Sequence, residues 1–137
     1  MKELSLEAKI ENVDRVIEFI NTELDALGCS SKTKIEINVA ADEIFANIVN
    51  YAYKPNTGNA TIQIDVIDNS KTVVITFIDK GIPFDPLIKK DPNVALSAEE
   101  REIGGLGIYI VKKTMDKVEY EYKDKQNILS ITKKIIV

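Results

Sequence analysis

Gly104, Gly105 and Gly107 stand within four residues of one another, in a chain that has six glycines in all. The residues that follow, 106–115, repeat apolar side chains at helical spacing, so the cluster lies at the start of a predicted helix. Glycines there leave backbone N–H groups exposed at the positive end of the helix, where phosphate oxygens bind. The cluster lacks the Gly-Lys-Ser/Thr ending of a P-loop, and Ile110 replaces the third glycine of the dinucleotide fingerprint. We expect an anion-binding loop, with a glycine turn packed for steric reasons as the alternative.

A polar face runs along the predicted helix at about 31–53. Four side chains share this narrow face at helical spacing: Glu36, Glu43, Asn47 and Asn50. Most of the remaining circumference is apolar, which predicts a buried helix whose polar face meets a pocket or partners. A solvent-facing stripe is the alternative. Glu43 and Asn47 lie one turn apart and offer oxygen ligands suited to Mg²⁺ or to a positioned water.

Asp79 ends an apolar, β-branched segment and is followed by Gly81. A carboxylate fixed at the end of a strand can accept a hydrogen bond from an amino group, such as the exocyclic nitrogen of adenine. Gly81 would let the backbone approach a flat ring closely. An aspartate that only caps a turn is the alternative.

Composition excludes several classes of function. The formal net charge of -4 disfavours nucleic acid as a partner, because nucleic-acid binders present basic patches. The chain has no histidine and a single cysteine, Cys29, which excludes histidine-activated nucleophiles, zinc sites built on His or Cys, and an internal disulfide. A general base must then be a carboxylate, Lys or Tyr. No apolar stretch has membrane-spanning length or resembles a signal peptide, so we expect a cytoplasmic protein with no membrane partner.

The other elements follow from periodicity and turn residues. Strands are predicted at 4–8, 60–67, 72–78, 118–122 and 128–137, and a further helix at 13–27. The last two strands are expected to form a hairpin around 123–127. Residues 80–103 hold three prolines and mixed charges, which is typical of a functional lid or a disordered link. At 137 residues the chain is expected to form one domain.

Three stretches in this order resemble the GHKL ATPases, which share the Bergerat nucleotide-binding fold. They are DEIFANIVNYAY at 42–53, IDKGIPFDP at 78–86 and GGLGIYIVKKTMD at 104–116. In length and detail the sequence is most similar to the stand-alone anti-sigma-factor serine kinases, and the similarity covers essentially the whole chain. The resemblance implies an α/β two-layer sandwich. Its mixed, mostly antiparallel sheet would be covered on one face by three helices, with one domain over 1–137 and an ATP lid at about 85–103.

The resemblance also implies roles for individual residues. Glu43 matches the general base, Asn47 the Mg²⁺-coordinating asparagine and Asp79 the aspartate that reads adenine. Gly81 would lie beneath the base. The phosphate loop would comprise Gly104, Gly105, Leu106, Gly107 and Ile108. Arg101, in the lid, is a candidate for reaching the γ-phosphate.

Two departures from the family pattern lie close to the expected adenine site. Pro83 stands where the adenine motif often has a second glycine, and this replacement is common in the anti-sigma branch. Asn127 and Ile128 stand where many relatives have Gly-Thr before the last strand.

The expected function is transfer of the γ-phosphoryl group of Mg-ATP to a serine on a STAS-domain anti-anti-sigma protein. Such a kinase is usually a homodimer and can also sequester a sigma factor. The alternative is a nucleotide-responsive binding protein that holds a sigma factor or STAS partner without phosphorylating it. The absence of histidine rules out a histidine autokinase within this chain.

Overall fold

One antiparallel sheet organises the computed structural model, which describes residues 1–88 and 105–135. Its strands, in chain order, are β1 (Lys2–Glu7), β2 (Asn59–Ile67), β3 (Thr72–Asp79), β4 (Lys117–Lys123) and β5 (Gln126–Lys134). In space they lie in the order β1-β2-β3-β5-β4, and each pairing among the described strands is antiparallel. The predicted two-layer sandwich is confirmed, with an antiparallel rather than a mixed sheet in the described part.

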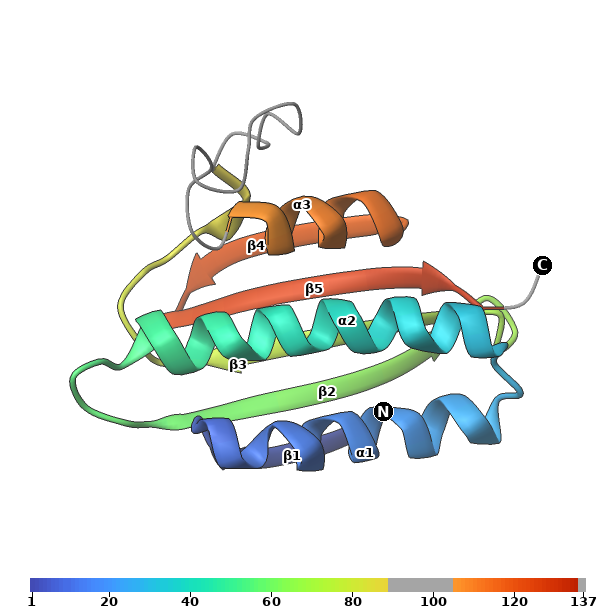
Figure 1. Cartoon of the computed structure of the whole chain (residues 1–137), viewed down its shortest axis with the longest axis horizontal. Helices are drawn as coiled ribbons and strands as arrows, with labels where there is room; N and C mark the ends of the chain where they lie inside the picture. The colour runs from blue at the N-terminus through green and yellow to red at the C-terminus, as the bar shows by residue number, and fades with distance from the viewer. Residues whose placement is uncertain (89–104, 136–137) are drawn as a thin grey trace.

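Three helices cover one face of this sheet (Figure 1). They are α1 (Val13–Ala26), α2 (Ser31–Asn47) and α3 (Gly105–Thr114). In the view of Figure 1, α1 is drawn over β1, α2 crosses the middle of the sheet and α3 lies next to β4. Shorter turns flank them: 3-10 turns at Ile10–Asn12 and Pro86–Ile88, and a π-helical turn, η2, at Ile48–Ala52. The π-helical turn continues α2 from Asn47, so the predicted helix over 31–53 changes its winding in its last part.

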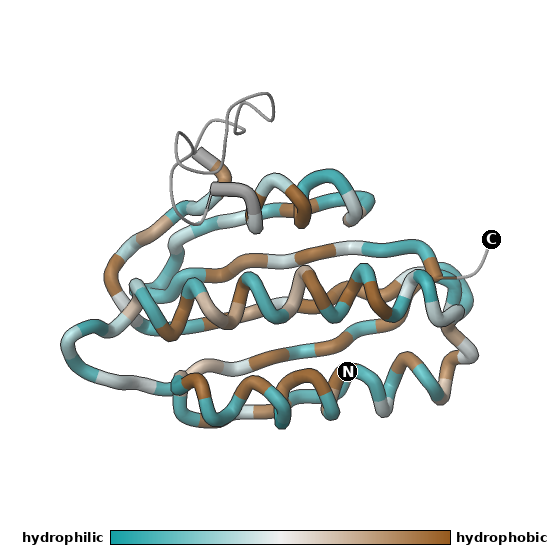
Figure 2. The backbone as a smooth tube through the Cα atoms, in the orientation of Figure 1, coloured by the Kyte–Doolittle hydropathy of each residue, from teal (hydrophilic) through white to brown (hydrophobic). Residues whose placement is uncertain are grey.

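The hydrophobic core lies between the sheet and the helices. Alternate strand residues are buried toward the helices, among them Ile62, Ile64, Ile75, Phe77, Leu129 and Ile131. Residues between them are polar, and Thr76 and Ser130 are hydrogen-bonded to each other across β3 and β5. Figure 2 shows the resulting alternation of hydrophobic and hydrophilic segments along the strands and helices. The same alternation places Asp79 and Asn127 on the buried face, at the ends of two apolar rows.

The turn between β4 and β5 is shorter than the sequence predicts. Asp124 and Lys125 both have positive φ, so two residues close the hairpin and Lys123 pairs with Gln126. This is the backbone geometry of a tight two-residue hairpin. Residue 127 therefore belongs to β5 instead of the turn, and Asn127 pairs with Asp79 across β3 and β5.

Part of the predicted lid falls outside the described residues. Residues 85–88 are described and contain the 3-10 turn at Pro86–Ile88. Residues 89–103, including Arg101, and Gly104 lie outside the described range. Within 1–88 and 105–135, no helix combines the length and the apolar character that crossing a bilayer would require.

Candidate functional site

Asp79 ends β3 with its carboxyl group buried, at 5 % exposure. Its Oδ1 accepts two hydrogen bonds of 2.9 Å, one from the backbone N–H of Gly81 and one from Nδ2 of Asn127. Burial raises the pKa of the Asp79 carboxyl, and these two hydrogen bonds oppose the rise. A carboxyl group held in this way at a strand end can accept a hydrogen bond from an amino group, and here it accepts one from the carboxamide of Asn127.

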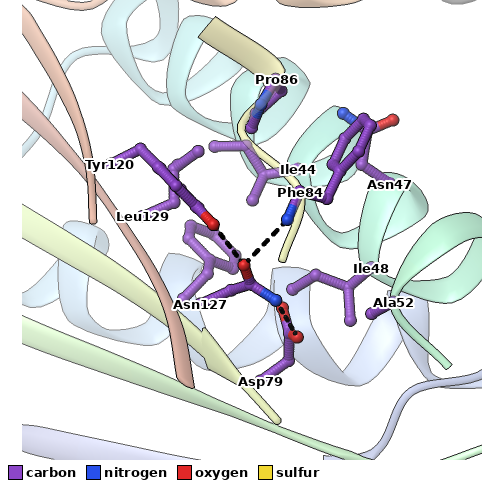
Figure 3. Close-up of a pocket in the computed structure, with 11 residues that line it drawn as sticks. Ile44, Asn47, Ile48, Ala52, Asp79, Phe84, Pro86, Tyr120, Asn127 and Leu129 are labelled. Carbon is purple, nitrogen blue, oxygen red and sulfur yellow. Dashed lines mark hydrogen bonds between the residues drawn. The ribbon is translucent and has the colours of Figure 1, made fainter. Parts of the chain in front are cut away.

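Asn127 connects Asp79 to its surroundings (Figure 3). Its Nδ2 donates to Asp79 and also to the carbonyl oxygen of Ile82, at 2.9 Å each. Its Oδ1 accepts from the backbone N–H of Phe84 at 3.1 Å and from the hydroxyl of Tyr120. A carboxamide has two N–H donors and two acceptor lone pairs, so its hydrogen-bonding capacity is fully used. Sequence reasoning missed this role because it placed residue 127 in the turn.

Gly81 lies against the π-helical turn that follows α2. A Cβ atom at this position would overlap the carbonyl oxygen of Ala52, and the next residue, Ile82, donates its N–H to that same oxygen at 2.9 Å. The glycine is therefore required for close packing of two backbone segments. Pro83 is exposed and stands between the two residues whose backbones bind Asn127.

A cavity opens between Asp79 and the end of α2. It encloses about 30 Å³ and is lined by Asn47, Asp79, Asn127 and apolar side chains from α2, η2 and the sheet. The ring of Phe84 also lines it and stacks on Tyr51, with ring centroids 5.2 Å apart. This volume suits about one water molecule, whereas ligand pockets measure roughly 300–1,000 Å³. In this conformation the cavity is too small for a purine.

Glu43 and Gly107 bring α2 and α3 into contact. Glu43 is half-buried on α2, and a Cβ atom at Gly107 would overlap its carboxyl group. For Gly107 the steric alternative therefore holds, because a side chain there would displace the Glu43 carboxyl group. The same contact places this carboxyl group at the first turn of α3, where backbone N–H groups are available to an anion. Glu43 makes a further polar interaction in the structure.

The remaining residues of the predicted phosphate loop begin α3. Gly105, Leu106 and Gly107 form its first turn, and the Ile108 side chain is buried, which leaves only backbone groups of Ile108 to meet a ligand. An anion here would meet the backbone N–H groups of this first turn.

The four residues of the polar face, three on α2 and Asn50 in η2, lie in different surroundings. Glu36 lies 3.8 Å from Nζ of Lys133, Glu43 contacts Gly107, and Asn47 lines the cavity. Asn50 is exposed. Glu43 and Asn47, near the end of α2, are therefore the members of this face that lie at the candidate site.

Oxygen ligands for Mg²⁺ are present at the same place. Within 1–88 and 105–135 there is no cluster of three or more acidic or cysteine side chains that could hold a metal. Mg²⁺ is commonly bound through one or two protein oxygens together with substrate phosphates. The Asn47 carboxamide, one turn from Glu43 and beside the cavity, fits that kind of site.

Comparison with known proteins accords with this geometry. A family model of the histidine kinase-like ATPase domain matches residues 6–133. The chain belongs to this family. Membership confirms the resemblance carried by the three motifs, and an ATPase domain implies ATP binding.

Curated proteins that resemble this chain are named as serine kinases. The serine/threonine-protein kinase BtrW of Bordetella bronchiseptica is 27% identical over 103 residues, which cover 75% of this chain and 72% of BtrW. The serine-protein kinase RsbW of Listeria innocua is 28% identical over 102 residues, or 71% of this chain and 64% of RsbW. RsbW of Bacillus anthracis is 25% identical over 131 residues, or 93% and 81%.

Solved structures of histidine kinases show the same fold. The histidine kinase AdeS of Acinetobacter baumannii matches with a TM-score of 0.55 and 13% identity, over 98% of this chain and 69% of AdeS. The catalytic domain of the histidine kinase ThkA matches with a TM-score of 0.51 and 12% identity, over 99% of both chains. At these identities the likeness concerns the fold alone.

Proposed function

We propose that this chain is an ATP-dependent protein serine/threonine kinase that phosphorylates a serine on a STAS-type anti-anti-sigma protein. Family membership and the kinship with BtrW and RsbW support the kinase assignment. The observation that carries it is the contact between the Glu43 carboxyl group and Gly107. This contact places a potential base on α2 beside the helix end where phosphate would bind. In this proposal residues 1–137 form one ATPase domain with a lid at about 85–103.

The nucleotide would lie between the end of α2 and the first turn of α3. Asp79 would accept a hydrogen bond from the adenine amino group, with Gly81 beneath the ring and Pro83 beside it. Asn47 would hold Mg²⁺ through its carboxamide oxygen, and the bound ion would neutralise charge on the β- and γ-phosphates. Backbone groups would bind the phosphate oxygens from Gly104, Gly105, Leu106, Gly107 and Ile108, and Arg101 would approach the γ-phosphate.

Glu43 would act as the general base. The serine oxygen attacks the γ-phosphorus, the bond from that phosphorus to the β–γ bridging oxygen breaks, and ADP leaves. The serine proton passes to the Glu43 carboxylate. Phosphoryl transfer requires mainly positioning and charge stabilisation, which backbone N–H groups, one metal ligand and one carboxylate can supply.

The partners follow from the same proposal. The STAS protein supplies the acceptor serine, and the kinase also holds a sigma factor and acts as a homodimer. The net charge of -4 supports a protein partner over nucleic acid.

Transfer of labelled γ-phosphate from ATP to a STAS protein encoded beside this chain tests the proposal. We expect wild type to bind Mg-ATP and transfer phosphate, and Asn47→Ala to lose Mg²⁺-dependent binding. ATP binding without transfer to any STAS protein tested would contradict the kinase assignment. It would favour a nucleotide-responsive protein that sequesters its partner.

A further inference from the structure

The two oxygens of the Asp79 carboxyl group differ in their partners. Oδ1 accepts two hydrogen bonds of 2.9 Å, one from the backbone N–H of Gly81 and one from Nδ2 of Asn127, and Figure 3 shows the second of them. Within residues 1–88 and 105–135, no hydrogen bond ends on Oδ2. A carboxylate has about four acceptor sites, so Asp79, which lines the cavity, keeps acceptor capacity for a ligand. One oxygen thus binds the protein, and the other keeps its lone pairs for a ligand.

We infer that Asn127 is a positioning residue: it fixes the Asp79 carboxyl group through Oδ1, so that Oδ2 is presented to the amino group of the base. The inference rests on the proposed function, because it takes Asp79 as the group that binds adenine. It adds a residue outside the three sequence motifs, and it gives that residue control over the preference for a base that carries an amino group.

The hydrogen bond from Asn127 restricts the rotation of the Asp79 carboxyl group. The torsion that turns an aspartate carboxyl group has only a broad preference of its own, and Gly81 lies only two residues along the same segment of chain. Asn127 instead comes from β5, where it pairs directly with Asp79 across the sheet. Two bonds from separate segments of the chain end on one oxygen, so the direction of the other oxygen is set.

The surroundings of Asn127 determine which end of its carboxamide faces Asp79. The backbone N–H of Phe84 is only a donor, and it lies 3.1 Å from Oδ1 of Asn127, which also accepts from the hydroxyl of Tyr120. The carbonyl oxygen of Ile82 is only an acceptor, and it receives Nδ2 at 2.9 Å. A flipped carboxamide would set donor against donor and acceptor against acceptor, so the NH₂ group stays on the side of Asp79.

The same hydrogen bond keeps Asp79 a good acceptor. Burial raises the pKa of this carboxyl group, and the hydrogen bonds from Asn127 and Gly81 lower it. Without Asn127 the carboxyl group loses one of its two donors and gains freedom to rotate, and both changes weaken its bond to an amino group. A hydrogen bond to a charged acceptor corresponds to about 10- to 100-fold in affinity, which sets the size of the effect.

Two further variants separate positioning from a loss of stability. Ile131→Val shortens a buried side chain in the same inward row of β5, and it should lower the Tm while leaving the preference for ATP unchanged. In the Asp79→Ala background, Asn127→Ala should leave the ratio of the Kd values for ATP and for an analogue without the amino group unchanged, because the positioned acceptor is gone. A lost preference in Ile131→Val, or a further fall in the Asp79→Ala background, would overturn the inference.

Calorimetric titration of each protein with Mg-ATP and with the Mg²⁺ complex of purine riboside triphosphate, which lacks the amino group, tests the inference. The ratio of the two Kd values measures the bond between the amino group and Asp79. We expect wild type to prefer ATP by about 10- to 100-fold and Asn127→Ala to lose about tenfold of this preference. The bonds that Ile82 and Phe84 lose in this variant affect both nucleotides alike, so their loss cancels in the ratio.

The outcomes distinguish the inference from the proposed function. A preference that survives in Asn127→Ala, with both nucleotides bound more weakly, would show that Asn127 is only structural, and the inference would be wrong. Equal Kd values for ATP and the analogue in wild type would contradict the proposed adenine site at Asp79, and the inference would fail with it. Asn127→Leu, which keeps the approximate size of the side chain, carries the same test if thermal unfolding shows that Asn127→Ala does not fold.

Discussion

The two ends of the candidate site are held together by different kinds of contact. At the base end, Asp79 and Asn127 are polar side chains from adjacent strands that satisfy each other in a buried place. At the phosphate end, Glu43 and Gly107 come from two helices and meet because one of them has no side chain. The base end is thus a hydrogen-bond network, and the phosphate end is a close approach between helices.

This difference predicts how substitutions will separate stability from function. The residues at the base end hold one another by hydrogen bonds, so changes there should alter affinity and stability together. A ligand at the phosphate end uses backbone groups and one carboxyl group. Changes there should alter phosphoryl transfer far more than nucleotide affinity.

Glu43→Gln should produce the largest effect. It removes the proposed base but keeps the size of the side chain, so phosphoryl transfer should fall about 10²- to 10⁴-fold with little change in the Kd for Mg-ATP. Single-turnover transfer and calorimetry measure the two quantities. Asp42→Asn is the matched control, because Asp42 is the exposed neighbouring carboxylate on α2. Transfer that survives in Glu43→Gln would show that the phosphate end needs no carboxylate base.

Asp79→Asn should weaken Mg-ATP binding by about 10- to 100-fold, because the buried carboxylate is the acceptor proposed for adenine. Calorimetry measures this loss. Asp65→Asn, an exposed carboxylate on the neighbouring strand β2, is the control. An unchanged Kd in Asp79→Asn would exclude Asp79 as the group that binds the base.

The free energy of unfolding of Asp79→Asn, relative to that of wild type, should increase as the pH rises. The native pKa of Asp79 lies above its ordinary value of 3.8, so the native state holds this proton more tightly than the unfolded chain. Its contribution to the free energy of unfolding is greatest below pH 3.8 and falls as the pH rises to the native pKa. Asp79→Asn lacks that loss, so its stability relative to wild type should rise across this interval and then stay level. Urea unfolding at a series of pH values would show the opposite slope if the pKa were lowered.

Gly107→Ala should disturb the phosphate end through a steric clash, without removing any polar group. The added Cβ overlaps the Glu43 carboxyl group, so the free energy of unfolding should fall by about 1–3 kcal/mol and phosphoryl transfer should fall about tenfold, less than in Glu43→Gln. Gly28→Ala is the control, because Gly28 has a φ of 73° with open space around it. It should cost about 1–2 kcal/mol through the backbone and leave transfer intact. Equal rates of phosphoryl transfer in Gly107→Ala and Gly28→Ala would contradict a role for the contact between Glu43 and Gly107 in catalysis.

Lys133→Met should have the smallest effect. Lys133 donates to the carbonyl of Thr114 at 2.6 Å and lies 3.8 Å from Glu36, away from the cavity. Loss of these contacts should lower the free energy of unfolding by about 1 kcal/mol without changing the Kd for Mg-ATP. A large change in Kd would show that the whole polar face of α2 belongs to the site.

Most of the fold could be predicted from periodicity, because the apolar rows of β2, β3 and α1 are local patterns. The π-helical turn after Asn47 and the contact between Glu43 and Gly107 could not, since both depend on packing between distant segments. Asn127 was misplaced for a different reason. Its position in β5 depends on Asp124 and Lys125 adopting positive φ. Aspartate is common at the first position of such a turn, but Lys125 stands where glycine is usual, so the sequence gives only half of the signal.

The central claim is that the base end accepts an amino group through Asp79, and binding of Mg-ATP compared with Mg-GTP by wild type tests it most directly. Guanine presents a carbonyl oxygen where adenine presents its amino group, and two acceptors facing each other in a buried site repel. We predict that ATP binds at least about a hundredfold more tightly than GTP. Equal affinities for the two nucleotides, or no binding of ATP, would contradict the account.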